Sequence, residues 1–174
     1  AASDVYKRQG ERGKYLEYLI AVTLYLEGVA PFYTFAKVPL VPNVEFDLIM
    51  YVENRGPIAI SIKTSLRERY KQADLEALAL KTVFRRAESY LLTLDDHEAG
   101  VQQKKLESGD LHALNQIFLV TSSDFDKFVE YLKKLRVVSS PIFSFVADPS
   151  REVHFHGQQP NTRLSFSRNR RKAK

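Results

Sequence analysis

The stretch from Val44 to Ala77, VEFDLIMYVENRGPIAISIKTSLRERYKQADLEA, decides the fold of this chain. Two apolar runs rich in β-branched residues, 44–52 and 57–63, flank Asn54-Arg55-Gly56, which is typical of two strands joined by a three-residue hairpin loop. Apolar residues then recur at three- and four-residue spacing over Leu66–Leu91, and this spacing predicts one long amphipathic helix. The stretch therefore predicts an antiparallel hairpin that leads directly into a helix.

The segments on either side extend this unit into an α/β fold. Because the expected elements follow the order αβββαβαβ, we expect a mixed central β-sheet flanked by helices. The further elements, in chain order, are a helix over Glu11–Gly28, a strand over 31–38, a loop over 95–112, a strand over 115–121, a helix over 124–135 capped by Ser123, and a strand over 141–147.

Length and composition indicate a single globular domain. The chain has 174 residues, of which 44% are hydrophobic and 27% charged, and it contains no cysteine. Disulfide scaffolds and cysteine-ligated zinc sites are therefore excluded. The net charge of +5 permits an anionic partner without requiring one. No apolar run is long enough to span a bilayer, so we expect no membrane association and a cytoplasmic location.

The two ends differ in composition from the middle of the chain. The first nine residues, AASDVYKRQ, resemble a translated cloning adaptor, and we set 1–9 aside as non-native. Residues 10–150 then form the expected folded domain, and 151–174 form a polar, basic tail. The segment from Arg163 to Lys174 holds six basic residues and no acidic one. This tail either adds attraction to phosphates or serves only to keep the protein soluble.

Polar residues converge at the open end of the predicted hairpin. With the loop centred on Arg55, Asp47 lies directly opposite Lys63, because the two positions are equally far from the turn. Ser61 is two residues before Lys63 and therefore points to the same face of the sheet. Taken alone, the Asp47–Lys63 pair is interpreted equally well as a salt bridge that only holds the strand ends together.

Acidic residues of two helices add to that pair. Glu76 lies between Ala73 and Leu80 on the predicted long helix, so it borders the face that packs against the sheet. The carboxylates of Asp47 and Glu76 could together hold a hard divalent cation such as Mg²⁺. A lysine beside such a metal helps to orient or deprotonate an attacking water. Glu17 is one position from the apolar stripe of the first helix, so it either faces the sheet or lies on the surface.

The spacing of these residues resembles the active site of PD-(D/E)xK nucleases. In most of that superfamily an acid stands two residues before the lysine, whereas Ser61 stands there in this chain. Residues 63–77, KTSLRERYKQADLEA, are similar to the catalytic segment of one restriction-endonuclease branch, the EcoRII and PspGI type and the related CCGG cutters. In that branch the acid comes from the next helix, thirteen residues after the lysine, and Lys63 and Glu76 have this separation.

The resemblance covers Glu17 to about Ala147. It implies a restriction-endonuclease-like core with Mg²⁺ as cofactor. It also implies a set of catalytic residues, of which Asp47 and Glu76 are the metal ligands. This set consists of Asp47, Lys63, Glu76, Ser61 and Glu17.

A charged triplet follows the lysine at a spacing that the same branch shares. The branch carries an arginine–acid–arginine triplet starting four residues after the lysine, and Arg67-Glu68-Arg69 matches it. Arginine donates two hydrogen bonds to guanine O6 and N7, and glutamate accepts from cytosine N4. The triplet therefore suits adjacent G·C pairs, and the resemblance implies a target that contains CC/GG. Without the active-site spacing, a solvated helix face would be the favoured interpretation.

These observations lead us to expect a Mg²⁺-dependent type II restriction endonuclease that acts on double-stranded DNA. Palindromic sites imply a homodimer or a higher even oligomer, and the resemblance implies a cognate DNA methyltransferase in the same system. Three alternatives remain open: a non-specific or repair-type nuclease of the same fold, a catalytically silent DNA-binding module, and an α/β domain whose Asp47–Lys63 pair is structural.

Overall fold

A computed structural model describes residues 2–41, 43–139 and 152–153 of the chain. Strands and helices alternate through most of this length, which is the pattern of an α/β protein. The elements are α1 (Ala2–Leu26), β1 (Phe32–Ala36), β2 (Phe46–Val52), β3 (Gly56–Lys63), α2 (Arg69–Val83), β4 (Glu88–Thr93), α3 (Asp96–Ser108), β5 (Gln116–Leu119), α4 (Ser123–Lys133), β6 (Val137–Val138) and β7 (Glu152–Val153).

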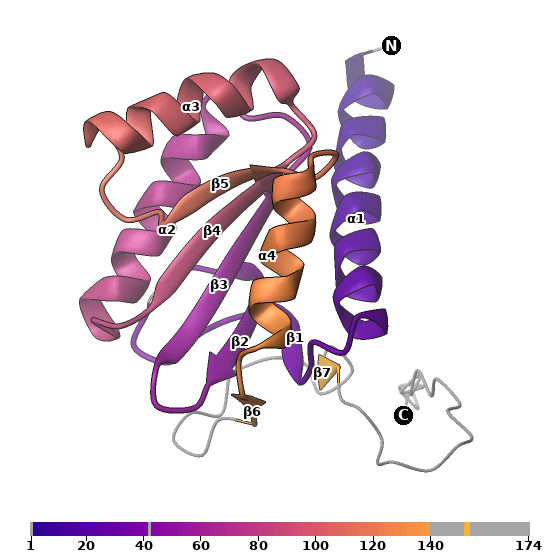
Figure 1. Cartoon of the computed structure of the whole chain (residues 1–174). Helices are drawn as coiled ribbons and strands as arrows, with labels where there is room; N and C mark the ends of the chain where they lie inside the picture. The colour runs from indigo at the N-terminus through magenta and orange to yellow at the C-terminus, as the bar shows by residue number, and fades with distance from the viewer. Residues whose placement is uncertain (1, 42, 140–151, 154–174) are drawn as a thin grey trace, which may run out of the picture.

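A mixed β-sheet forms the centre of the molecule, as predicted (Figure 1). Its strands lie in the order β5-β4-β3-β2-β1-β7, and the short β6 pairs with the end of β2. Strand β2 runs antiparallel to both β1 and β3, whereas β4 runs parallel to both β3 and β5. Parallel neighbours need crossover connections, and α2 and α3 supply them.

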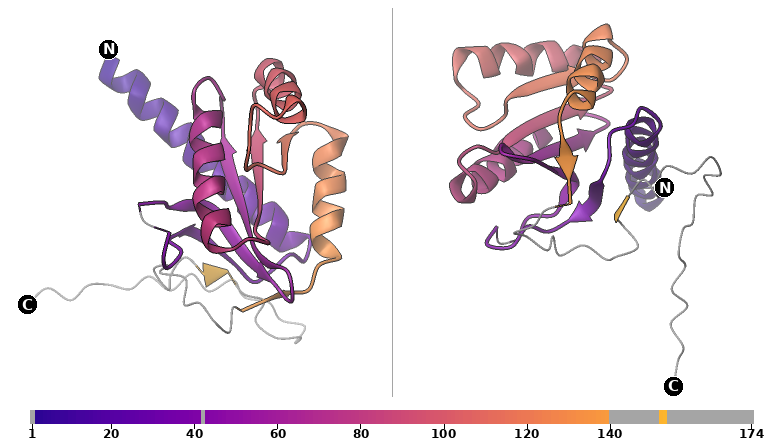
Figure 2. Two further views of the ribbon diagram at one scale, coloured as in Figure 1. Left: turned by 90° about the vertical axis from the view of Figure 1, so that its left-hand side faces the viewer. Right: turned by 60° about the horizontal axis from the view of Figure 1, so that its bottom comes forward.

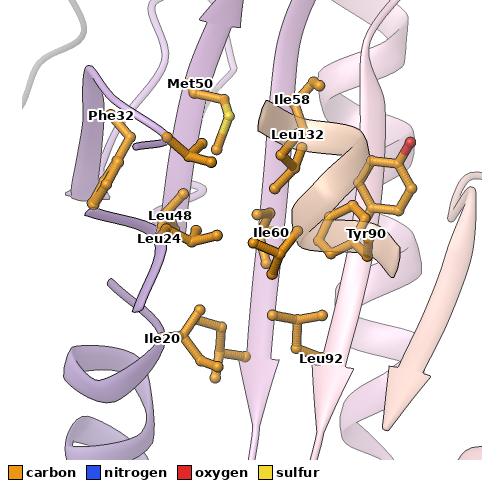
Figure 3. Packing of buried hydrophobic residues seen from close by; sticks show 14 of the residues in the cluster. Ile20, Leu24, Phe32, Leu48, Met50, Ile58, Ile60, Tyr90, Leu92 and Leu132 are labelled. Atoms are coloured by element: carbon orange, nitrogen blue, oxygen red, sulfur yellow. The ribbon is translucent and has the colours of Figure 1, made fainter. Parts of the chain in front are cut away.

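Helices cover both faces of this sheet (Figures 1 and 2). Ile20 and Leu24 of α1 and Leu132 of α4 belong to one core cluster with Leu48 and Ile60 of the sheet, as Figure 3 shows. The opposite face buries one side of α2, and the partly buried Leu106 of α3 packs against the same face. Burial of each large aliphatic side chain stabilises the fold by roughly 1.5–3 kcal/mol, so the hydrophobic effect fixes all four helices on the sheet.

The long helix predicted over Leu66–Leu91 is wrong. The helix α2 ends at Val83, and the residues that follow turn into strand β4. Tyr90 and Leu92 join the core on one face of the sheet and Leu91 joins it on the other, which is the two-residue alternation of a strand. Because β4 is buried on both faces, it forms a continuous apolar run. Apolar residues of this run therefore fall by chance at the three- and four-residue spacing of the preceding helix.

The loop expected over 95–112 is also wrong, because most of it forms α3. The Asp95 carboxylate accepts a hydrogen bond from the N–H of Glu98 and so caps the helix start, and Gly109 ends the helix with a φ of 84°. Only two side chains of α3 are buried, so the segment carries little apolar periodicity. The fold therefore has one strand and one helix more than predicted before β5. The strand predicted over 141–147 lies outside the described residues.

The other elements confirm the prediction to within a few residues, with one larger difference. The helix α1 begins at Ala2 rather than Glu11, so residues 2–9 of the segment that we set aside belong to the same helix. The residue directly before α4 is Ser122 rather than Ser123.

The register of the hairpin differs by two residues from that predicted. Val52 pairs with Gly56, so the loop comprises the three residues between them, and Asn54 at its centre takes a left-handed φ of 64°. Because side chains alternate with a period of two, a displacement by two residues keeps Asp47 and Lys63 on the same face. The polar end of the hairpin is retained, with Lys63 two residues past the position directly across from Asp47.

Candidate active site

The beginning of β2 and the end of β3 form the centre of the candidate site. Lys63 Nζ donates a hydrogen bond to Asp47 Oδ2 at 2.7 Å, and the backbone N–H of Ile62 donates to the same oxygen at 2.7 Å. Both charged side chains are largely buried, with 16% of Asp47 and 13% of Lys63 exposed. Within the described residues no hydrogen bond reaches Asp47 Oδ1. One carboxylate oxygen is therefore held in place while the other is available to a ligand.

The pair lies at the carboxyl ends of the parallel strands β3 and β4. Lys63 pairs with Thr93 across these strands. Thr93 Oγ1 accepts from the N–H of Asp95 at 3.0 Å, and Asp95 Oδ2 accepts from the N–H of Leu66 at 3.3 Å. These bonds tie together the loops that lead into α2 and α3. This edge of a parallel sheet is where α/β proteins commonly bind their ligands.

The helix α2 brings Glu76 to the same site. Glu76 is half-buried, and its Oε1 accepts a hydrogen bond from Gln72 Nε2 at 2.7 Å. Burial raises the pKa of Glu76 above its ordinary value, and the hydrogen bond from Gln72 and the charge of Lys63 partly offset that rise. The charge of Asp47 also raises this pKa, and the polar side chain of the buried Ser61 lowers it. Glu76 is thus near enough to the ion pair for its charge to interact with those of Asp47 and Lys63.

The helix α1 brings a third carboxylate, that of Glu17. Its neighbours Leu16 and Ile20 pack into the core, which turns Glu17 toward the sheet. Glu17 Oε2 is buried and has no hydrogen-bond partner in the described part of the chain. Burial and then the charge of Asp47 raise the pKa of Glu17, whereas the charge of Lys63 lowers it. The sequence left open whether Glu17 faces the sheet or lies on the surface, and in the structure it is half-buried on the side of the sheet.

The donor set suits a hard divalent cation. Burial penalises the ionised forms of Glu17 and Glu76, and a cation beside them would remove that penalty. The residues that the structure describes contain no group of three or more His, Cys, Asp or Glu side chains placed so that they could hold a metal ion. Mg²⁺ is typically held by one or two carboxylates, with water and phosphate oxygens completing its coordination. Asp47 and Glu76 are the two carboxylates that would supply such a pair of protein ligands.

The charged triplet lies on the surface at the start of α2, the helix that also carries Glu76. Arg67, Glu68 and Arg69 are all exposed, and α2 begins at the last of them. Arg67 has a φ of 31°, and Glu68 forms an ion pair with the exposed Lys71 at 2.6 Å. The triplet therefore lies at the start of the helix, as the sequence predicted. Its contact with bases stays a prediction.

Two residues that shape the site were not predicted from the sequence. Gln72 positions Glu76 from one helical turn away, and the four-residue spacing of a glutamine and a glutamate was a usable signal. Asp95 joins the two loops at the edge of the sheet and caps α3. Asp95 and Glu98 have the spacing of a capping box, which the long-helix interpretation concealed.

Comparison with known proteins does not assign the chain to a family. No protein-family model, curated protein or solved structure matches it. None of the described helices is long and apolar enough to cross a membrane. The resemblance to PD-(D/E)xK nucleases therefore rests on the residues of the site.

Proposed function

We propose that this chain is a Mg²⁺-dependent type II restriction endonuclease that hydrolyses phosphodiester bonds of double-stranded DNA at a site containing CC/GG. The observation that carries this proposal is the Asp47–Lys63 ion pair, with Glu76 and the unpartnered oxygen of Glu17 beside it. A structural salt bridge requires no further half-buried carboxylates, whose desolvation opposes folding. Acids with perturbed pKa values gathered around a lysine are typical of functional sites.

The carboxylates provide the metal-binding function in this proposal. Asp47 and Glu76 would hold Mg²⁺, and Glu17 lies near enough for its charge to interact with that of Asp47. When bound, the metal polarises the phosphate and lowers the pKa of a coordinated water. Metal binding requires ionised carboxylates. Because the pKa of Glu76 is raised, we expect activity to be lost at acidic pH, where Glu76 becomes protonated.

Lys63 provides a positive charge next to the reacting phosphate. Asp47 holds its ammonium group at 2.7 Å and uses one of its three N–H donors. The other donors are then available to orient the attacking water and to stabilise negative charge on the phosphate oxygens. Ser61 stands where most of the superfamily has an acid, and we assign it hydrogen bonding to Glu76 rather than metal binding.

The exposed triplet provides base recognition. Arg67 and Arg69 would donate to guanines and Glu68 would accept from a cytosine. The ion pair of Glu68 with Lys71 has both side chains exposed, and because solvent screens such pairs, exchanging it for contacts with DNA costs little. A two-fold symmetric target calls for a homodimer or a higher even oligomer. The proposal also includes a cytoplasmic location and a cognate DNA methyltransferase that protects the host sites.

The test is digestion of a long defined DNA in Mg²⁺ and in EDTA by the wild type, Lys63→Ala and the control Lys127→Ala. Lys127 also forms an ion pair at 2.7 Å, with Asp124, but both side chains are exposed on α4. We expect discrete Mg²⁺-dependent fragments from the wild type and the control, and intact DNA with Lys63→Ala. Sequencing of the fragment ends then shows whether CC/GG lies at each cut.

The remaining outcomes separate the alternatives. A smear of fragments that requires Lys63 would indicate a non-specific or repair-type nuclease. DNA binding without cleavage, unchanged in Lys63→Ala, would indicate a silent DNA-binding module. Intact DNA without binding, together with a loss of stability in Lys63→Ala, would leave the Asp47–Lys63 pair a structural role.

A further inference from the structure

The helix α1 has two apolar sides, and one of them faces away from the sheet. Leu16, Ile20 and Leu24 are buried in the core. The other side carries five large apolar residues, here called the α1 stripe, whose exposed fractions range from 52% to 74%. The α1 stripe consists of Tyr15, Tyr18, Leu19, Val22 and Leu26. Figures 1 and 2 show α1 along one edge of the molecule.

The spacing of the α1 stripe is self-complementary. Tyr15, Leu19, Val22 and Leu26 follow one another at intervals of four, three and four residues, which is the spacing of a coiled-coil seam. The intervals are the same from either end, so an antiparallel second copy places Leu26 against Tyr15 and Val22 against Leu19. We propose that two copies of this chain pair through the α1 stripe, with their α1 helices antiparallel about a two-fold axis.

The area of the α1 stripe agrees with such a pair. If each of the five residues is assigned the lower part of the range of roughly 150–250 Å² that holds for aromatic side chains, their exposed fractions correspond to at most on the order of 600 Å² per copy. A monomer seldom exposes a larger contiguous apolar patch than this, since its largest is about 300–600 Å². Two copies would bury about 1,200 Å² in total, which is the lower end of specific protein interfaces.

The position of the α1 stripe leaves the candidate site open. Glu17 is two residues from both Tyr15 and Leu19, and each helical residue turns the direction by about 100°. Glu17 therefore points to the side of α1 opposite the pairing surface. The inference does not depend on the proposed function, because it uses only the surface of α1. Because the α1 stripe is complementary to itself under a two-fold rotation, the partner that it fits is a second copy of this chain.

The first experiment measures the mass of the full chain by sedimentation velocity over a range of micromolar concentrations. We expect a monomer–dimer equilibrium, and Leu19→Glu is expected to raise the dimer Kd at least about tenfold. The matched control is Leu75→Glu on α2, because Leu75 is 65% exposed and Leu19 is 60% exposed. A monomer at every concentration would overturn the proposal, as would a dimer that Leu19→Glu leaves unchanged.

A second experiment tests the direction of the helices. The chain has no cysteine, so Tyr15→Cys and Leu26→Cys can be made singly and oxidised alone or as a mixture. The antiparallel pair brings residue 15 of one copy to residue 26 of the other, and like positions lie about 16 Å apart along the axis. We expect a disulfide-linked dimer from the mixture and none from either variant alone. A linked dimer from Tyr15→Cys alone would contradict the antiparallel arrangement.

Discussion

Replacing Glu17 by glutamine is expected to stabilise the protein at neutral pH and to weaken its interaction with Mg²⁺. Glu17 Oε2 is buried without a partner, and burial and then the charge of Asp47 raise the pKa of the side chain. Glutamine keeps the shape of glutamate and removes its charge. The substitution therefore removes the cost of ionising this carboxyl group in the folded state.

The size of the effect follows from the surroundings of Glu17. Glutamine still places a polar atom at the buried position of Oε2, so the gain comes only from removing a charge whose burial is unfavourable. Glu17 is only half-buried and the charge of Lys63 favours its ionised form, so we expect a gain of at most about 1 kcal/mol. In a domain of this size that corresponds to a rise of about 2–4 °C in Tm.

The gain has a defined dependence on pH. Between the ordinary value of 4.5 and the raised pKa, the folded state binds more protons at Glu17 than the unfolded state does. The stability of the wild type, compared with that of Glu17→Gln, therefore falls as the pH rises through this window. Below pH 4.5 the carboxyl group is neutral in both states, and the difference between the proteins becomes independent of pH.

The assay is thermal unfolding from acidic to neutral pH, with and without Mg²⁺. The control is Glu11→Gln, which changes an exposed glutamate on the same helix. Mg²⁺ is expected to raise the Tm of the wild type more than that of Glu17→Gln, because only the folded carboxylates bind it. A lower Tm for Glu17→Gln, or an effect of equal size at every pH, would refute the reasoning.

Three further substitutions test neighbouring contacts. Gln72→Ala removes a hydrogen bond that lowers the pKa of Glu76, so the acidic limb of the pH–rate profile for DNA cleavage is expected to move to higher pH. Lys63→Met leaves the largely buried Asp47 without its cation, so the free energy of unfolding in urea is expected to fall by about 1–3 kcal/mol. The same substitution is expected to cost less in a protein that already carries Asp47→Asn. Asp74→Ala removes the acceptor of three backbone N–H groups in the loop before β5, and the same assay should show a loss of about 3 kcal/mol or more.

The sequence predicted those parts of the fold in which local pattern and tertiary environment agree. The hairpin has apolar runs and a turn, and both survive in the structure. Strand β4 was missed because burial on both faces makes Tyr90, Leu91 and Leu92 a continuous apolar run without strand alternation. The helix α3 was missed for the opposite reason, since it has only two buried side chains and its ends are defined by the Asp95 cap and by Gly109.

The candidate site was more predictable than the register that positions it. Asp47 and Lys63 share a face in any register displaced by an even number of residues, so an error of two residues did not separate them. The position of Glu17 was open because its helix face depends on how α1 docks against the sheet. Gln72 was missed because its role is to orient another side chain, which a search for charged residues does not detect.

The most direct test of the proposed chemistry is the rate at which the wild type and Asp47→Asn cleave a supercoiled plasmid in Mg²⁺. Asparagine has nearly the shape of aspartate but lacks the charge that a metal and Lys63 require. We expect Mg²⁺-dependent cleavage by the wild type and a loss of at least about a hundredfold in Asp47→Asn, whose folded state is confirmed by circular dichroism. Equal rates for the two proteins, or a wild type that leaves the plasmid intact in Mg²⁺, would contradict the assignment of this site as a nuclease centre.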